Sequence, residues 1–99
     1  MQLFKRRAWW SQQGLPQLRL LAIEQWDPLN VYEDPLRADA YDAYLERVGR
    51  MLRHGAGAAE IARYLGQVRT KALARSENEE ADEAFAHRVV AWYAVEKPS

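Results

Sequence analysis

Ninety-nine residues suffice for one domain with a single hydrophobic core and leave no room for a second domain of ordinary size. Hydrophobic residues make up 48% and charged residues 28%, which is too apolar for a disordered chain. Fourteen basic and fourteen acidic side chains cancel, which disfavours a general polyanion binder, and the lack of cysteine excludes disulfides, thiolate metal sites and thiol nucleophiles.

The basic start of the chain does not resemble a secretory signal. Lys5, Arg6 and Arg7 are followed by polar glutamines and Pro16, where such a segment needs a continuous apolar run. No part of the sequence approaches about 18 uncharged apolar residues, the length that a membrane-spanning helix requires. We therefore expect an uncleaved cytoplasmic protein without a transmembrane segment.

A single domain is predicted over residues 1–99, with residues 1–14 as a loosely attached N-terminal segment. Trp9 and Trp10 are adjacent in this segment. Neighbouring residues on a helix point about 100° apart, so these two rings cannot both face one narrow core stripe. We expect one ring to stay available. Three alternatives stay open: the segment packs on its own bundle, it binds a partner protein, or it binds a membrane surface, where basic and aromatic residues cooperate.

The first helix is predicted from near Pro16 to about Trp26. Proline is favoured in a first helical turn, and the Asp27-Pro28 step ends the helix. This helix carries more apolar residues than one buried face requires. One face is formed by Leu15, Leu18, Ala22 and Trp26, whereas Leu20 and Ile23 project in other directions. We expect either the N-terminal segment or another chain to cover this additional apolar surface.

Residues 27–38 form the one long connection of the predicted fold. Asp27-Pro28 and Asp34-Pro35 predict two stiff turns within it. The surrounding sequence is strongly acidic, because residues 24–46 hold Arg37 as the only base against seven acids: Glu24, Asp27, Glu33, Asp34, Asp39, Asp42 and Glu46.

Three further helices follow. The second is capped by Asp39 with Asp42 and ends at Gly55-Ala56-Gly57, with a regular apolar face: Tyr41, Tyr44, Leu45, Val48 and Leu52. The third runs from about Ala58 to Leu73, with another such face: Ala58, Ile61, Ala62, Leu65, Val68 and Ala72. The fourth opens with the capping box Ser76-Glu77-Asn78-Glu79 and buries Ala81, Phe85, Val89 and Trp92. The expected fold is all-α, a small antiparallel bundle of about four helices.

Charge alternates in blocks along these helices. From the second helix onward, acids stand at the start of each helix, where they complement the helix dipole. The alternative is a nucleic-acid-binding patch in the basic 47–75 region, formed by Arg47, Arg50, Arg53, Arg63, Arg69, Lys71 and Arg75.

Residues suited to catalysis or metal binding are few. His87 follows Glu83 by four residues and lies opposite Phe85 on the helix wheel, so an exposed pair is expected. A carboxylate-bridged metal bundle would need glutamate three residues before His87, where the chain has Ala84. His54 has no obvious carboxylate partner. We expect no catalytic residues, no metal site and no cofactor, and hence no enzyme.

Residues 26–65 carry a resemblance to a known family. Its most specific element is Trp26-Asp27-Pro28-Leu29-Asn30-Val31, followed by Tyr41-Asp42-Ala43-Tyr44, Gly55 and Glu60-Ile61-Ala62-Arg63-Tyr64-Leu65. The chain here resembles a family of small bacterial helical proteins that is itself a domain of unknown function. The family often has glycine in place of Asn30, and asparagine also enters left-handed conformations. The basic, tryptophan-rich start departs from the family, so nothing carries over to it.

Relatives of this kind include proteins proposed to be immunity proteins of bacterial toxin systems, so the resemblance implies a binding role. An acidic surface suits that role, because acidic inhibitors associate rapidly with basic nucleases. Tyr32 would be an anchor. The alternative for Asp27 is a structural cap of its turn. The expected function is a non-catalytic protein-interaction module that binds another protein or a second copy of itself, through Trp9, Trp10, Asp27, Tyr32, Glu33, Asp34, Asp39 and Asp42.

Overall fold

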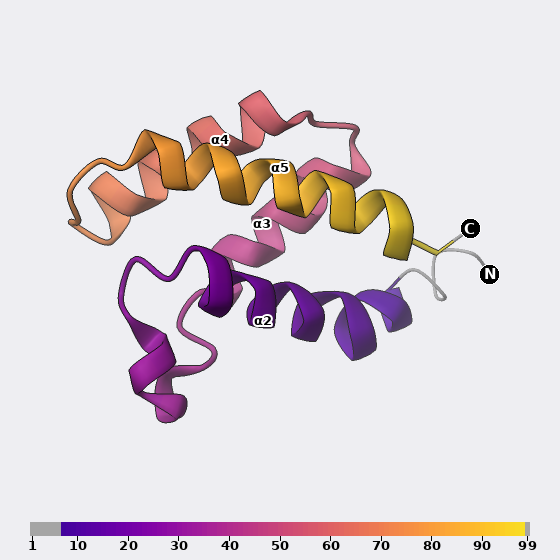
Figure 1. Cartoon of the computed structure of the whole chain (residues 1–99). Coiled ribbons are helices and arrows are strands. Elements are labelled where there is room, and N and C mark those ends of the chain that lie inside the picture. The colour runs from indigo at the N-terminus through magenta and orange to yellow at the C-terminus, as the bar shows by residue number, and fades with distance from the viewer. Residues whose placement is uncertain (1–6, 99) are drawn as a thin grey trace.

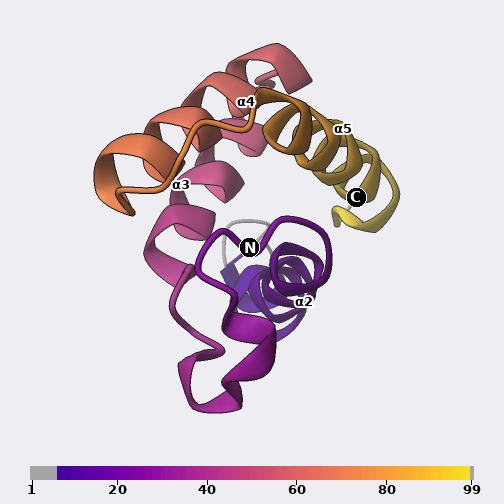
Figure 2. The ribbon, with the colours of Figure 1, turned by 60° about the vertical axis from the view of Figure 1, so that its left-hand side comes forward.

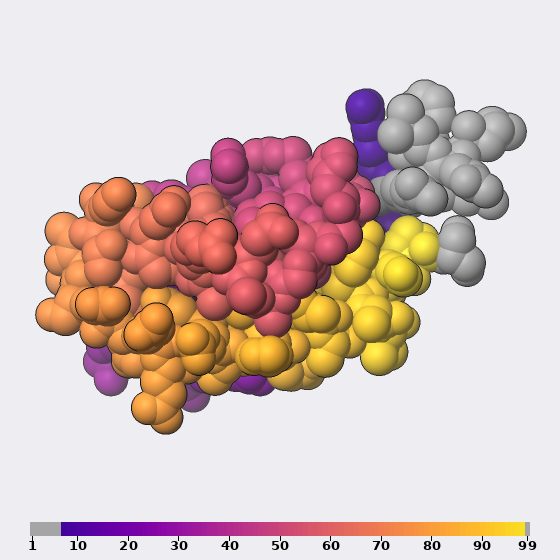
Figure 3. Space-filling model, turned by 90° about the horizontal axis from the view of Figure 1, so that it is seen from above, coloured from indigo at the N-terminus to yellow at the C-terminus, as the bar shows by residue number. Residues whose placement is uncertain are grey.

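The computed structural model describes residues 7–98, and helices without any strand form the ordered framework of this part (Figure 1). Helix α2 spans Leu15–Gln25, α3 spans Asp42–Arg53, α4 spans Ala58–Gln67 and α5 spans Glu79–Glu96. Helices α4 and α5 lie side by side in opposite directions (Figures 1 and 3), and α2 packs against α3 and α5 (Figure 1). The prediction of a small all-α antiparallel bundle is confirmed.

Helix α2 begins one residue before Pro16 and ends one residue before Trp26, close to the predicted bounds. It is preceded by a π-helical turn, Trp10–Gly14, that the sequence did not predict. In an uninterrupted α-helix the carbonyl of Gln12 would clash with the ring of Pro16. Proline also has no N–H that could donate a hydrogen bond to this carbonyl. The wider π-helical turn lies at this point of conflict, and the Leu15 N–H bonds to the Trp10 carbonyl instead.

Helix α3 starts without the predicted aspartate cap. Its first helical residue is Asp42. Tyr41 stands at the N-cap position, and its side chain makes no capping hydrogen bond. The carboxylate of Asp42 instead accepts two hydrogen bonds from Arg19 on α2, at 3.0 and 2.7 Å. The helix dipole still favours an acid here, but the tertiary partner takes the oxygens that a capping box would use.

Helix α4 continues into a second π-helical turn, Val68–Ala72, so the predicted helix from Ala58 to Leu73 is present in this altered form. Ile61, Leu65 and Val68 are buried as expected, whereas Ala72 is exposed. The apolar face of this segment therefore ends before the helical winding does.

The cap of α5 is Asn78 rather than Ser76. The Asn78 side chain accepts a hydrogen bond from the Ala81 N–H at 3.1 Å, and the helix begins at Glu79. Asparagine two residues later in the chain performs the capping role that the sequence assigned to serine. Phe85, Val89 and Trp92 are buried as predicted, and Ala81 is half-buried.

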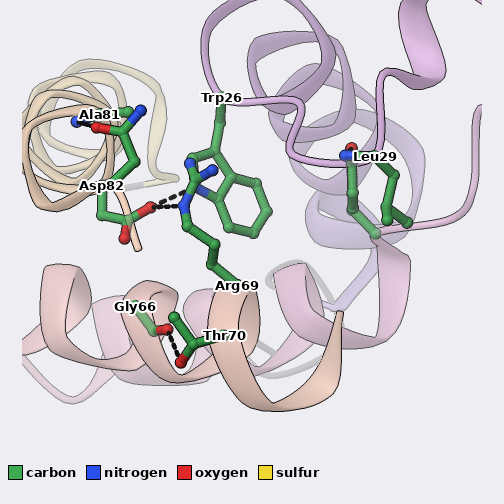
Figure 4. A network of polar contacts seen from close by, with 9 residues as sticks. Trp26, Leu29, Gly66, Arg69, Thr70, Ala81 and Asp82 are labelled. Carbon is green, nitrogen blue, oxygen red and sulfur yellow. Dashed lines mark hydrogen bonds and ion pairs between the residues drawn. The ribbon is translucent and has the colours of Figure 1, made fainter. Parts of the chain in front are cut away.

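The core contains a charged pair that the sequence did not predict. Asp82 accepts hydrogen bonds at one carboxylate oxygen from the Trp26 indole, at 2.8 Å, and from Arg69 Nε, at 3.0 Å (Figure 4). The side chains of Arg69 and Asp82 are only 8% and 3% exposed. The assignment of Arg69 to an exposed basic patch is therefore wrong. Its burial is tolerated because the carboxylate of Asp82 pairs with the cation.

Trp26 joins this pair to the rest of the core. Its ring stacks on Phe85 at 5.5 Å between centroids and lies 5.3 Å from Tyr41, and the Arg69 guanidinium carbon is 5.9 Å from the ring centroid. Arg69 Nη2 is buried without a hydrogen-bond acceptor within residues 7–98. Removing one partner of such a buried pair is strongly destabilising, whereas replacing both by well-packed apolar side chains is often neutral.

Over the described part of the chain, no helix combines the length and apolar character needed to cross a bilayer. The π-helical turn Trp10–Gly14 and the last turn of α5 lie at one end of the molecule, and the connection between α2 and α3 projects at the other (Figure 1). Viewed from the side, this connection extends from α2 away from α4 and α5 (Figure 2).

Candidate protein-binding surface

The connection between α2 and α3 is organised by the carboxylate of Asp27. Asp27 has a positive φ of 40°, and its side chain accepts hydrogen bonds from the Val31 N–H at 2.7 Å and the Tyr32 N–H at 2.9 Å. Asn30 also adopts a left-handed conformation, with φ of 57°. These bonds convert a proline-containing loop into a fixed turn.

Tyr41 ties the same turn to the core. Its hydroxyl donates to Asp27 at 2.6 Å and accepts from the Leu29 N–H at 2.8 Å, while the ring is fully buried. Burial and, secondarily, the hydrogen bond to Asp27 raise the pKa of Tyr41 above its ordinary value. Asp27 therefore has the structural role that the sequence offered as the alternative to partner steering.

Two short 3-10 turns, Val31–Glu33 and Pro35–Arg37, form the outer part of the connection. The second begins at the predicted Asp34-Pro35 step. The turn predicted at Asp27-Pro28 precedes the first and is closed by a hydrogen bond from the Asn30 N–H to the Asp27 carbonyl at 3.1 Å. The two 3-10 turns present two large apolar side chains to solvent: Leu36 is 94% exposed and Tyr32 is 71% exposed. Leu20 and Val95 are the other large apolar side chains that stand out strongly in the described residues, and each is alone on its helix.

Acidic side chains accompany this apolar pair. Glu33 and Asp39 are exposed and Asp34 is half-buried, with Arg37 as the exposed base among them. We define the connection surface as Tyr32, Glu33, Asp34, Leu36 and Asp39. Leu36 was not singled out from the sequence, although a leucine between proline and arginine in a turn has no neighbouring helix face on which to pack.

The predicted partner-binding residues divide between separate places. Asp42 is engaged by Arg19 in a pair whose side chains are 27% and 30% exposed, and the hydrogen bond to Asp42 raises the pKa of Arg19. Trp9 and Trp10 lie at the opposite end of α2 from the connection surface. The structure thus brings the loop residues together but does not bring the tryptophans to them.

Both tryptophans pack on the bundle. Trp10 is buried, and its indole donates to Glu46 Oε2 at 2.9 Å. Trp9 is half-buried and stacks on Trp92 with centroids 6.0 Å apart. Residues 7–14 are attached to the body through these contacts, while residues 1–6 of the predicted loose segment lie outside the described residues.

The histidines occupy exposed positions. His87 and Glu83 both face solvent, as the wheel predicted, and His54 is exposed after the end of α3. Among residues 7–98, no three histidine, aspartate or glutamate side chains are grouped so that they could share a metal ion.

Part of the basic 47–75 region remains on the surface. Arg47, Arg50 and His54 line a cleft of about 330 Å³ beside Glu60, and Arg47 also lies over the Tyr64 ring at 5.3 Å. Burial raises the pKa of Tyr64, and the nearby Arg47 partly offsets this effect. The basic side chains that line this cleft do not include Arg69.

Comparison with known proteins gave no match to a family model, a curated protein or a solved structure. The resemblance of residues 26–65 to the family described above therefore stays a prediction.

Proposed function

We propose that this protein is a non-catalytic, cytoplasmic protein-interaction module that binds a basic partner through its connection surface. The supporting observation is the exposure of Tyr32 and Leu36, four residues apart in the connection. Asp27 and Tyr41 hold the backbone at Tyr32, and Leu36 lies in the 3-10 turn Pro35–Arg37. A preordered loop loses little conformational entropy when a partner binds it. Tyrosine is one of the residue types that most often supply a large share of the binding free energy in protein interfaces, and Leu36 would add apolar contact area beside it.

The charge of the surface supports a basic partner. Glu33, Asp34 and Asp39 lie in the same connection as the apolar anchors, and opposite charges at a rim accelerate association and fix orientation. The proposed partner therefore presents an apolar pocket inside a basic rim. The family resemblance extends this proposal to an immunity-like role, in which the partner is a basic toxin.

Affinity capture from the native cell, with matched variants of the full chain, tests the proposal. Tyr32→Ala/Leu36→Ala removes both anchors, whereas Leu20→Ala/Val95→Ala removes two exposed apolar side chains elsewhere and serves as the control. We expect a basic protein that is retained by the wild type and the control and is lost from the anchor variant. Identical captured proteins with both double variants would contradict the proposal.

Mass determination in solution separates a foreign partner from a second copy of the chain. If the connection surface binds another copy, the wild type will be oligomeric and the anchor variant monomeric. A monomeric wild type that captures the basic protein identifies a different chain as the partner.

A second candidate function is nucleic-acid binding by the cleft of Arg47, Arg50 and His54. Titration with a short duplex at low salt tests it, because phosphate contacts make affinity fall steeply as salt rises. Loss of binding in Arg47→Gln/Arg50→Gln would support this function. Absence of binding at low salt would eliminate it.

A further inference from the structure

A cleft lined by aromatic rings lies at the end of the molecule opposite the connection surface. Trp9, Trp10 and Tyr93 supply the rings, Leu52 supplies an aliphatic patch, and Arg53 and Lys97 supply the charge. Its volume of about 440 Å³ is within the range of small-molecule sites, which are mostly apolar with a few placed polar groups. None of the described residues that line it is acidic.

Two glycines make room for the tryptophans that form this cleft. A Cβ atom at Gly49 would lie 2.6 Å from Trp10 Cη2. A Cβ atom at Gly14 would lie 2.8 Å from both Trp10 Cε3 and Trp9 Cζ3. No side chain larger than hydrogen fits either position while the rings stay in place.

Trp9 and Trp10 both line the cleft although they are adjacent in the chain. Trp9 has regular α-helical dihedral angles, with φ of −58° and ψ of −47°, and the π-helical turn begins at Trp10. The ring centroids of the two residues lie 6.4 Å apart, with the ring planes at 47° to each other. Trp10 is buried and Trp9 is half-buried, so Trp9 is the ring with more surface available to a ligand.

The two cations stand against the aromatic walls. The Arg53 guanidinium carbon lies 6.0 Å from the Trp10 ring centroid, and Lys97 Nζ lies 5.7 Å from the Tyr93 ring centroid. Within residues 7–98 neither forms an ion pair with a carboxylate. Both side chains are exposed, so their charged groups can reach a ligand that enters between the rings.

We propose that this cleft binds a small planar aromatic carboxylate. A flat ring in the ligand would stack against the tryptophan and tyrosine walls, where offset aromatic pairs are favourable. The carboxylate would accept hydrogen bonds from Arg53, whose planar guanidinium matches it in a bidentate geometry, with Lys97 adding charge. A cationic ligand is disfavoured, because Arg53 and Lys97 would repel it.

Calorimetric titration of the full chain with three probes tests both parts of this chemistry. 2-Naphthoate carries ring and charge, 2-naphthylmethanol carries the ring alone, and cyclohexanecarboxylate carries the charge without an aromatic ring. We expect saturable 1:1 binding of 2-naphthoate, about tenfold weaker binding of 2-naphthylmethanol, and no detectable binding of cyclohexanecarboxylate. Equal binding of the first two probes, or none by 2-naphthoate up to its solubility limit, would overturn the proposal.

Two substitutions of arginine locate the site. Arg53→Met keeps an unbranched side chain but removes the guanidinium, and we expect about tenfold weaker 2-naphthoate binding. Arg63→Met makes the same change of net charge at an exposed position of α4 and serves as the control. Equal affinities of the two variants would contradict the assignment. Lys97→Met, at the residue that follows the end of α5, gives an independent variant that should also weaken 2-naphthoate binding.

The indole N–H resonances provide a readout that does not depend on affinity. Trp10 and Trp9 line the cleft, whereas the Trp26 indole is bonded to Asp82 inside the core. On addition of 2-naphthoate we expect the Trp9 and Trp10 signals to shift and the Trp26 signal to stay. A shift of Trp26 alone would overturn the proposal.

This inference is independent of the proposed protein-binding function. The variant Tyr32→Ala/Leu36→Ala should bind 2-naphthoate with wild-type affinity, and Arg53→Met should retain the captured basic protein. Each failure can therefore be attributed to one surface.

Discussion

Asp82, which binds the Trp26 indole, and Asp27, which follows Trp26 in the chain, differ in what they organise. Asp82 lies in the core and joins α5 to Trp26 and to Arg69. Asp27 follows Trp26 in the chain, is partly exposed and binds two backbone N–H groups and the Tyr41 hydroxyl. One carboxylate fixes how helices pack, and the other fixes the shape of a surface segment. The same residue type therefore supports the fold in one place and a candidate binding surface in the other.

Asp82→Ala should produce the largest effect. It leaves the Arg69 cation buried without its partner, which costs about 3–5 kcal/mol of unfolding free energy. Denaturant unfolding followed by circular dichroism measures the loss. Glu83→Ala, at the neighbouring exposed position, should stay within about 0.5 kcal/mol of wild type. Similar stabilities of the two variants would show that the buried network does not stabilise the packing.

Asp27→Ala should have a smaller and more local effect. We expect a loss of about 2 kcal/mol, because two backbone N–H groups and the Tyr41 hydroxyl lose a charged acceptor. Hydrogen exchange should accelerate at the Val31 and Tyr32 amides while the Leu65 amide stays protected. Asp39→Ala, in the same segment, is the control and should leave these amides unchanged. Uniform acceleration along the chain would mean that Asp27 supports the whole fold.

The raised pKa of Tyr41 predicts loss of stability in alkali. The folded state holds the phenol proton more tightly than the unfolded state, so the contribution is complete below the ordinary pKa of 10.0. As pH rises beyond that value, the free energy of unfolding should fall by up to about 1.4 kcal/mol per pH unit. Tyr41→Phe should reduce this decline to the part contributed by Tyr64, whose pKa is also raised, and Tyr32→Phe should retain it in full. Parallel pH profiles for wild type and Tyr41→Phe would refute the prediction.

The pair of Arg19 and Asp42 should have the smallest effect. Both side chains are about a quarter to a third exposed, so solvent weakens their attraction. A double-mutant cycle with Arg19→Ala and Asp42→Ala should give a coupling energy of about 0.5–1 kcal/mol that decreases with added salt. A coupling as large as the effect of Asp82→Ala would remove the contrast between buried and half-exposed pairs.

Local sequence patterns determined where the helices lie. The apolar spacing of Leu45, Val48 and Leu52 predicts the buried face of α3, and Gly55 ends that helix with a φ of 84°. The two aspartate-proline steps predict the turns of the connection, and Asn30 takes the left-handed conformation expected of asparagine. These features depend on residues within a few positions of one another, so the sequence contains their signals directly.

Only the tertiary structure decided which polar and aromatic side chains are buried. Asp82 lies three residues before Phe85 and therefore on the inner face of α5, but its partners Arg69 and Trp26 are 13 and 56 positions away. Trp10 packs over Gly49, which stands on a different helix. Such pairings depend on how helices cross and on where a π-helical turn alters their winding. A helix wheel assigns faces within one helix, and it contains no information on the partner that makes a buried charge or a second tryptophan tolerable.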